Sequence, residues 1–318
     1  MQEIRWRIRL YIAATDASAV FLLWQAALGE LWPIDFERFQ QILAAPFAQH
    51  FVAWENGEAI GFVATSQSER WGKRSGHLLA LMVTPSHQGQ GLGLALHEKA
   101  LTYLYEASLN SIELAWVSPC FWWGIPINLP HALAFFQAQG WKIRETVYDL
   151  TRDLSHYTVP SHIYQRLSDQ QISLAQANPK DAQAILNFVD YECADRLSNY
   201  QYLLNLGDYQ DILLARTQDG IVVGALLLST PQSHPARMDV VWRATLGWNT
   251  GSIDALSVAG YAQGRGIGTA LLARACELLK ERGVYNSYIG WVWPSDAGFY
   301  ARLGYRKWRV YEMSSRRL

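Results

Sequence analysis

Two short glycine-rich stretches have the residue types and spacing of an anion-binding loop. Gln88–Gly93 reads QGQGLG and Gln263–Gly268 reads QGRGIG, so both follow the pattern Q-x-x-G-x-G. Each stretch follows an apolar run and precedes a long amphipathic run, which predicts a strand, a loop and a helix in that order. The backbone N–H groups of such a loop, with the partial positive charge of the helix N-terminus, can bind a phosphate group.

The spacing of the glycines excludes two common nucleotide-binding motifs. A dinucleotide fingerprint needs G-x-G-x-x-G, but its last position holds Leu94 in one copy and Thr269 in the other. A P-loop ends in G-K-[ST], which neither copy contains. The glycine spacing alone therefore does not identify the ligand of these loops, and the surrounding elements must be considered.

The elements before the loops also occur twice. Asn56-Gly57 and Asp219-Gly220 each predict a tight turn between two strands, because these residues tolerate positive φ. Helix starts are predicted at Thr15-Asp16 and at Asn178-Pro179, where N-cap residues precede an amphipathic run. The strands that lead into the two loops are predicted at 77–83 and 253–258.

The elements after the loops repeat as well. Phe135–Trp141 (FFQAQGW) and Phe299–Tyr305 (FYARLGY) each predict the end of a short helix, and a last strand follows each of them. We therefore expect two similar domains, 1–155 and 156–318, each closed by its own last strand, with the boundary near Leu154–Ser161.

Composition excludes several classes of function. The chain has 318 residues, of which 50% are hydrophobic and 17% charged, and its net charge is −1, so no basic field favours nucleic acid or a membrane surface. Three widely spaced cysteines favour reduced thiols over a disulfide framework or a zinc site. The N-terminus lacks an apolar signal-peptide region, and no run suits a membrane span, so a cytoplasmic location is expected. The fourteen tryptophans indicate core filling, or a site for an apolar or aromatic ligand.

The doubled Q-x-x-G-x-G pattern resembles the pyrophosphate-binding motif of the GNAT superfamily of N-acetyltransferases, which bind acetyl-CoA there. The resemblance covers nearly the whole chain, as a tandem arrangement similar to that of mycothiol synthase. It implies an α/β fold of the α+β type: two GNAT-like domains, each a mixed, mostly antiparallel sheet flanked by helices. It also implies that the fourth and fifth strands splay apart and that the pantetheine arm enters the gap. Acetyl-CoA is then the co-substrate, and no metal is needed.

The resemblance assigns residues to the binding of CoA. The pyrophosphate would lie against the loop amides, where a Cβ at Gly266 or Gly268 would hold it away, and Arg265 would either contact a CoA phosphate or remain a solvated side chain. The expected CoA-binding residues are Leu256, Val258, Gln263, Gly264, Arg265, Gly266, Ile267 and Gly268, with Gln88, Gly89, Gly91 and Gly93 in the first half.

The resemblance also assigns catalytic roles in the second half. A tyrosine often stands four residues before the glycine of the last helix in this family, and Tyr300 and Gly304 have that spacing. Its phenol would protonate the leaving thiolate, and a backbone N–H near Val258 would hold the thioester carbonyl. Asp254, nine residues before Gln263, is either the general base or a carboxylate that only bonds a neighbouring backbone amide.

The first half differs at the position of the acid. Phe136 stands where Tyr300 stands in the second half, so we expect CoA binding without acid catalysis there. His77 is either a base or, more commonly for such a residue, structural. An asparagine that often precedes the last helix in the family is missing, since Leu129 and Trp293 occupy its place.

The expected reaction is acetyl transfer from acetyl-CoA to a primary amine of a small molecule or peptide, by direct attack in a ternary complex. The alternatives are a non-catalytic acyl-CoA-binding protein, or an acyltransferase that uses a longer acyl chain. Asp190, Glu192 and Asp195 either attract a cationic amine or form a solvated helix face. The pattern identifies neither the acceptor nor the oligomeric state.

Overall fold

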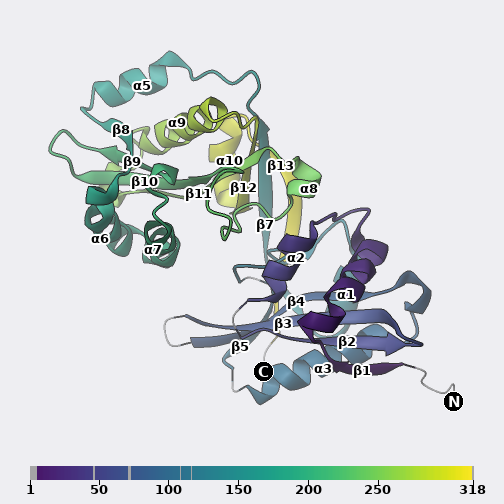
Figure 1. Ribbon diagram of the computed structural model, residues 1–318. Coiled ribbons are helices and arrows are strands. Elements are labelled where there is room, and N and C mark those ends of the chain that lie inside the picture. Colours follow the sequence, from purple (N-terminus) through teal and green to yellow (C-terminus); the bar gives the residue numbers. More distant parts are fainter. Residues whose placement is uncertain (1–5, 46, 71–72, 108, 116, 317–318) are drawn as a thin grey trace. The chain divides into compact units, whose positions relative to one another are not determined.

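The computed structural model describes residues 6–45, 47–70, 73–107, 109–115 and 117–316 (Figure 1). The chain forms two compact units: unit 1 comprises Met1–Val147 with Arg309–Leu318, and unit 2 comprises Tyr148–Trp308. None of the described helices combines the length and the hydropathy of a membrane span.

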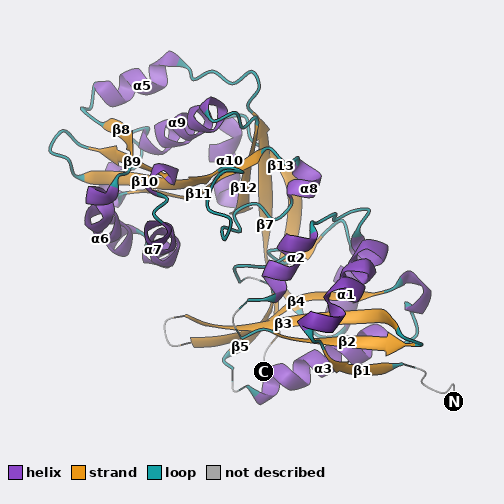
Figure 2. Ribbon diagram, in the orientation of Figure 1, coloured by secondary structure: helices purple, strands orange, loops and turns teal. Residues whose placement is uncertain are grey.

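Unit 1 is a sheet with helices on both faces (Figure 2). Its strands run in the order β1-β2-β3-β4-β5-β13, and only the pair β4 and β5 is parallel among the pairs described for these strands. Helix α3 packs on β2, β3 and β4, and α1 packs on β3 and β4. In chain order the elements are β1 (Arg7–Leu10), α1 (Ala13–Leu28), α2 (Phe36–Leu43), β2 (Gln49–Glu55), β3 (Glu58–Arg70), β4 (Lys73–Val83), α3 (Leu92–Glu106), β5 (Ser111–Leu114), β6 (Ile125–Pro126), α4 (Pro130–Ala138) and the first half of β7 (Lys142–Asp153).

Unit 2 repeats this plan. Its strands run in the order β7-β12-β11-β10-β9-β8, and β11 and β12 form the parallel pair. Helix α9 contacts β9, β10 and β11, while α6 packs on β10. The elements are the second half of β7, α5 (Ser161–Ser168), β8 (Ser173–Gln176), α6 (Ala182–Glu192), α7 (Leu197–Leu206), β9 (Ile212–Arg216), β10 (Val222–Ser229), α8 (Arg243–Leu246), β11 (Thr250–Val258), α9 (Ile267–Glu281), β12 (Asn286–Val292), α10 (Pro294–Arg302) and the first residues of β13 (Arg306–Arg316), whose remainder belongs to unit 1.

The last strands are exchanged between the units, which differs from our expectation that each half closes its own sheet. Strand β7 pairs with β12 of unit 2 from Tyr148 to Asp153, and β13 pairs with β5 of unit 1 at Ser315 and Arg316. Each strand is long enough to leave one unit and enter the other. The compact units are interleaved along the chain, so their bounds do not test a single division between residues 155 and 156. The division into domains 1–155 and 156–318 stays a prediction.

Of three local predictions for the elements before the loops, two agree with the structure and one is wrong. Asn56 and Gly57 both have positive φ and join β2 to β3, as the hairpin signal predicts. Asn178 caps the turn at Pro179, as expected. The helix start at Thr15-Asp16 is wrong: α1 begins at Ala13, and the buried Asp16 carboxylate accepts a hydrogen bond from the Ile12 N–H from within the first turn.

Tryptophans fill much of the core of unit 1, which agrees with the interpretation that their large number serves core filling. Trp24 and Trp32 are fully buried, and Trp24 stacks on Trp122 with ring centroids 5.3 Å apart. Phe121 and Trp122 come from the segment PCFWWGIPINLP, which has no counterpart in the second half. The segment therefore contributes to the core as well as to the surface of unit 1.

Candidate active site

The two glycine loops have the same backbone conformation. Gly264 and Gly266 have φ of +73° and +89°, and Gly89 and Gly91 have φ of +72° and +87°. Only glycine adopts this left-handed region without strain. Backbone conformation is thus a sufficient reason for these glycines, and the expected close approach of a ligand stays a prediction. Gly268 has no positive φ, and a Cβ there would make ordinary contacts with Val258 and Phe299.

Each loop is held by the glutamine that begins it. Nε2 of Gln263 donates to the carbonyl oxygen of Val258 (3.2 Å), and Nε2 of Gln88 donates to that of Val83 (3.0 Å). Both acceptors are the last residues of the strands that precede the loops. The two glutamines therefore fix the strand-to-helix turn that presents the N-termini of α9 and α3.

Helix α5 and the turn that follows it supply two side chains to the loop of unit 2. Nη2 of Arg166 donates to the carbonyl oxygen of Gly264 (2.8 Å), and a Cβ at Gly266 would lie 3.1 Å from Arg166. Gln170 exchanges hydrogen bonds with Arg265, accepting from its Nε at 2.8 Å. Two guanidinium groups thus lie at the loop. In unit 1, Gln90 takes the place of Arg265 and bonds the Ser86 carbonyl instead.

Strands β11 and β12 separate beyond their N-terminal ends. Their parallel pairing joins Thr250–Ser252 to Asn286–Tyr288. On the other side of β11, Ala255 and Leu256 lie opposite a single residue of β10, which is a β-bulge. Ala255 and Trp291 both have positive φ, +51° and +53°, an uncommon conformation for residues other than glycine. Such outliers concentrate where a structure holds a functional site.

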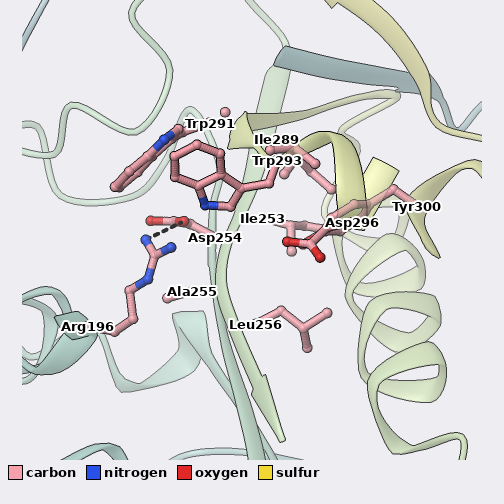
Figure 3. Close-up of a pocket in the computed structure, with 12 residues that line it drawn as sticks. Arg196, Ile253, Asp254, Ala255, Leu256, Ile289, Trp291, Trp293, Asp296 and Tyr300 are labelled. Atoms are coloured by element: carbon pink, nitrogen blue, oxygen red, sulfur yellow. Dashed lines mark ion pairs between the residues drawn. The ribbon is translucent and has the colours of Figure 1, made fainter. Parts of the chain in front are cut away.

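A small cavity of about 110 Å³ opens between the separated strands (Figure 3). Asp254 and Leu256 reach it from β11, Trp291 from β12, and Tyr300 from α10. The structure thus brings Asp254, Leu256 and Tyr300 together. Val258 is not among the residues that line this cavity. The full lining is Arg196, Ile253, Asp254, Ala255, Leu256, Ile289, Gly290, Trp291, Val292, Trp293, Asp296 and Tyr300.

The phenol of Tyr300 is a proton donor at neutral pH. Burial, followed by the negative charges of Asp254 and Asp296, raises the pKa of Tyr300 to about 12. The hydroxyl is therefore fully protonated at physiological pH. A thiolate is a weaker base than this phenolate, because an ordinary thiol has a pKa of about 8.5, so passing the proton to a leaving sulfur is an uphill step that reprotonation of Tyr300 from solvent must follow.

The carboxylate of Asp254 is held loosely. Its nearest described cation is Arg196, with Nη1 3.9 Å from Oδ1, and Asn199 donates to Oδ2 at 3.4 Å. The side chain is 42% exposed, so a pair of this length contributes little to stability. The described contacts of Asp254 are to side chains, which does not favour the purely structural bond to a backbone amide. Arg196 in turn lies over the Trp291 ring, 5.3 Å from its centroid.

The acidic residues at the end of α6 serve other contacts. Glu192 accepts a hydrogen bond from the Gly260 N–H (2.8 Å), and Asp195 pairs with Arg196 at 3.2 Å. Asp190 is exposed on α6. Glu192 therefore supports the turn that precedes the glycine loop, and none of the three lines the cavity.

Comparison with protein families identifies the family to which this chain belongs. The profile of the Acetyltransferase (GNAT) family matches residues 17–120 and 180–305, which together cover more than half of the chain. The chain belongs to the GNAT family. The resemblance in the loops is confirmed, and so is the fold of two mixed, mostly antiparallel sheets flanked by helices.

Individual relatives agree with this membership. An "uncharacterized N-acetyltransferase" of Archaeoglobus fulgidus is 42% identical over 71 residues, which are 21% of this chain and 46% of that protein. A solved fungal structure, described as a GCN5-related glucosamine N-acetyltransferase region of a multi-domain GH3 β-N-acetylglucosaminidase, is 34% identical with a TM-score of 0.92. The match covers 98% of this chain but 38% of the fungal one. The chain thus spans less than half the length of both relatives.

A tandem GNAT protein from the clavulanic acid biosynthesis pathway shares the fold over 98% of both chains, with 15% identity and a TM-score of 0.69. A GCN5-related N-acetyltransferase of Sphaerobacter thermophilus does so with 18% identity and a TM-score of 0.73, over 100% of this chain and 97% of that one. These two likenesses establish the tandem GNAT fold alone.

The GNAT unit of the first half lacks both candidate catalytic side chains. Nine residues before Gln88 stands Leu79, where Asp254 stands before Gln263, and Phe136 takes the place of Tyr300. Leu79 and Phe136 both line a cavity between the corresponding strands. His77 is structural: its Nδ1 contacts the Ala115 carbonyl oxygen and its Nε2 contacts Ser68, both at 2.7 Å, and burial lowers its pKa to about 4.

Sequence reasoning missed several residues of the second GNAT unit. Arg166 and Gln170 lie about a hundred positions before the loop that they contact, and no motif marks them. Arg196 follows α6 without a recognisable pattern. The buried Asp149, on β7, accepts a hydrogen bond from the Trp291 N–H (3.2 Å) and so supports its unusual backbone.

Proposed function

We propose that this protein is an N-acetyltransferase that transfers the acetyl group of acetyl-CoA to a primary amine, and that unit 2 carries out the reaction. One observation carries the proposal: Asp254 and Tyr300 line one cavity between β11 and β12. Asp254 is on β11, the strand that leads into the glycine loop, and Tyr300 is on α10. A protein that only binds acyl-CoA has no use for a half-buried, protonated phenol and a loosely held carboxylate in that cavity.

The donor would bind along β11. Its pyrophosphate would accept hydrogen bonds from loop amides between Gln263 and Gly268 at the N-terminus of α9. Arg166 and Arg265, both at the loop, offer positive charge to the phosphates. The pantetheine arm would follow the unpaired part of β11 past Val258 and Leu256 and so reach the cavity.

The chemistry follows from the side chains in the cavity. The neutral amine attacks the thioester carbonyl carbon, and a backbone N–H of β11 holds the developing oxyanion. The C–S bond then breaks, and Tyr300 gives its proton to the departing sulfur. Asp254 receives the proton that the amine loses, directly or through water. The products are an amide and free CoA, and Tyr300 is reprotonated from solvent.

We propose an amino sugar as the acceptor. The fungal relative that is 34% identical is described as a glucosamine N-acetyltransferase region. The cavity itself has two tryptophan rings with centroids 5.9 Å apart and two aspartates, Asp254 and Asp296. Aromatic faces pack against the C–H faces of a sugar ring, and carboxylates attract its ammonium group.

The test is release of free CoA thiol from acetyl-CoA with glucosamine as acceptor. N-acetylglucosamine, whose amine is already blocked, is the matched control. We expect thiol release and a product heavier by one acetyl group with glucosamine, and neither with the control. If simple alkylamines react as fast as glucosamine, the amino-sugar assignment is wrong while acetyl transfer stands. Absence of thiol release with every amine tested would leave only the acyl-CoA-binding alternative.

A further inference from the structure

The cavity of unit 1 differs from that of unit 2 in size and chemistry. Its volume is about 430 Å³ against about 110 Å³, although both lie between the parallel strands that separate. The larger value falls within the range of small-molecule sites. Its lining is Ala27, Leu28, Leu31, Leu78, Leu79, Ala80, Leu81, Gln88, Leu114, Ala115, Trp122, Gly124, Ile125, Pro126, Asn128, Leu129, Pro130, His131, Ala132 and Phe136.

This lining carries no group suited to acyl transfer. The counterparts of Asp254 and Tyr300 are Leu79 and Phe136, and the only titratable side chain among the residues named is His131, an exposed residue at the start of α4. Most other members are aliphatic. A bound molecule would therefore be surrounded by hydrocarbon and left chemically intact.

Two polar groups indicate which molecule fits. Gln88 lines the cavity and begins the first glycine loop, so the cavity is continuous with a phosphate-binding turn. Oδ1 of Asn128 is buried in the lining and has no hydrogen-bond partner among the described residues. A buried acceptor without a partner is costly, and a ligand N–H would satisfy it. Pantetheine has two amide N–H groups.

The empty volume argues against acetyl as the acyl group. The side chains that line an empty apolar cavity lack the van der Waals contacts that a ligand would provide. A small acetyl group would leave most of this space unfilled. A hydrocarbon chain would fill it, and each CH₂ that enters lowers the free energy of binding.

We propose that unit 1 binds the CoA thioester of a medium-chain fatty acid, with an acyl chain of about eight carbons, and holds it without transferring it. The phosphates lie at the Gln88–Gly93 loop, an amide of pantetheine donates to Asn128, and the acyl chain occupies the apolar interior. This inference concerns a different site from the proposed acetyl transfer, and either can fail alone.

The experiment is titration calorimetry on the full chain with octanoyl-CoA, acetyl-CoA and octanoate. We expect octanoyl-CoA to bind at least about tenfold more tightly than acetyl-CoA, since six additional CH₂ groups become buried. Thiol release from octanoyl-CoA should be absent with or without amine. Equal affinities for the two thioesters, or turnover of octanoyl-CoA, would overturn the proposal. Octanoate that binds as tightly as octanoyl-CoA would show that the CoA part is not recognised.

Two variants place the site in unit 1. Ala132→Phe fills the cavity from the half-buried face of α4 and should abolish the preference for the longer chain. Asn128→Leu should weaken the binding of both thioesters at the site of unit 1 by the same factor, because it removes only the acceptor. Leu256→Phe, which narrows the cavity of unit 2, is the matched control and should leave octanoyl-CoA binding unchanged. If Leu256→Phe alone removes the preference, the long chain binds in unit 2 and the proposal is wrong. Thermal unfolding of each variant verifies that it is folded.

Discussion

At the residue scale, a single hydroxyl distinguishes Tyr300 from Phe136. Replacing Tyr300 by Phe keeps the ring and removes the proton donor, so we expect kcat to fall by roughly 10- to 10⁴-fold. The dissociation constant of acetyl-CoA should change little, because the glycine loop and the aromatic ring at position 300 remain. Steady-state kinetics and titration calorimetry on the same preparation provide both values.

The reverse change, Phe136→Tyr, is the control for this prediction. It should not make unit 1 a transferase, because Leu79 still stands where Asp254 stands in unit 2. If Tyr300→Phe leaves kcat intact while Phe136→Tyr raises it, the active site has been assigned to the wrong unit.

Asp254 offers a second prediction that separates its possible roles. Asp254→Asn removes the charge and the basicity while keeping the shape, so kcat/KM for the amine should fall by about 10²-fold or more. If Asp254 removes a proton from the ammonium form of the acceptor before the attack, the deficit should shrink at pH values above the pKa of that amine, where the amine is already neutral. A deficit of equal size at every pH would indicate that Asp254 accepts the proton only after the attack, or positions the substrate.

The sequence revealed the parts of the site that have a local pattern. Asp254 stands nine residues before Gln263 and Tyr300 stands four residues before Gly304, and the structure places Asp254 and Tyr300 in one cavity. Arg166, Arg196 and Asp149 could not be found, because their contacts join residues that are distant in sequence. Which side chain of an exposed helix reaches a loop depends on packing, and no spacing encodes it.

At the element scale, the glycine loop owes its residues to backbone conformation. Gly264→Ala and Gly266→Ala should each destabilise unit 2 by about 1–2 kcal/mol, because both positions have left-handed φ. Gly268→Ala should be neutral or slightly stabilising, since its Cβ would lie at ordinary distances from Val258 and Phe299. Chemical denaturation measures all three. Equal losses at the three positions would contradict this explanation.

Helix α5 adds a charge to the same loop. If Arg166 contacts the phosphates of CoA, Arg166→Ala should weaken acetyl-CoA binding by roughly tenfold at low salt and by less at high salt. Arg166→Lys keeps the charge and should recover part of the affinity. The thermal stability of the two variants should be similar, because Arg166 is exposed and the described hydrogen bond of its side chain is to a loop carbonyl. A loss of affinity that does not depend on salt would indicate a structural role instead.

At the scale of the whole molecule, the exchanged strands are the main feature that the repeat did not predict. A repeat in sequence shows which elements recur, but not which copy of a sheet a last strand joins. Arg309–Arg316 belongs to unit 1, where Tyr311 is fully buried and its ring centroid lies 6.2 Å from that of Trp32. A chain that ends at Trp308 should therefore lose stability in unit 1, although the missing residues follow unit 2 in sequence. Hydrogen exchange resolved by segment tests this, and unchanged protection in β4 and β5 would refute it.

The units should also differ in their response to acid. Unit 1 buries His50, His77 and His97, and burial is the first cause that lowers the pKa of each, to about 4 for His77 and His97. The histidines of unit 2, His156, His162 and His234, are exposed.

A buried histidine with a lowered pKa stays neutral in the folded unit, while the unfolded chain binds a proton near its ordinary pKa of about 6.5. The unfolded state therefore binds more protons between pH 6.5 and 4, and the stability of unit 1 falls as the pH decreases through that window. The raised pKa of the half-buried Glu113 opposes this trend for one group only. We expect a loss on the order of a few kcal/mol in unit 1, and a smaller loss in unit 2. Hydrogen exchange at pH 7, 5.5 and 4.5, corrected for intrinsic rates, should show the sheet of unit 1 opening first. Loss of protection in both units at the same pH would mean that they unfold as one body, joined by the strands they exchange.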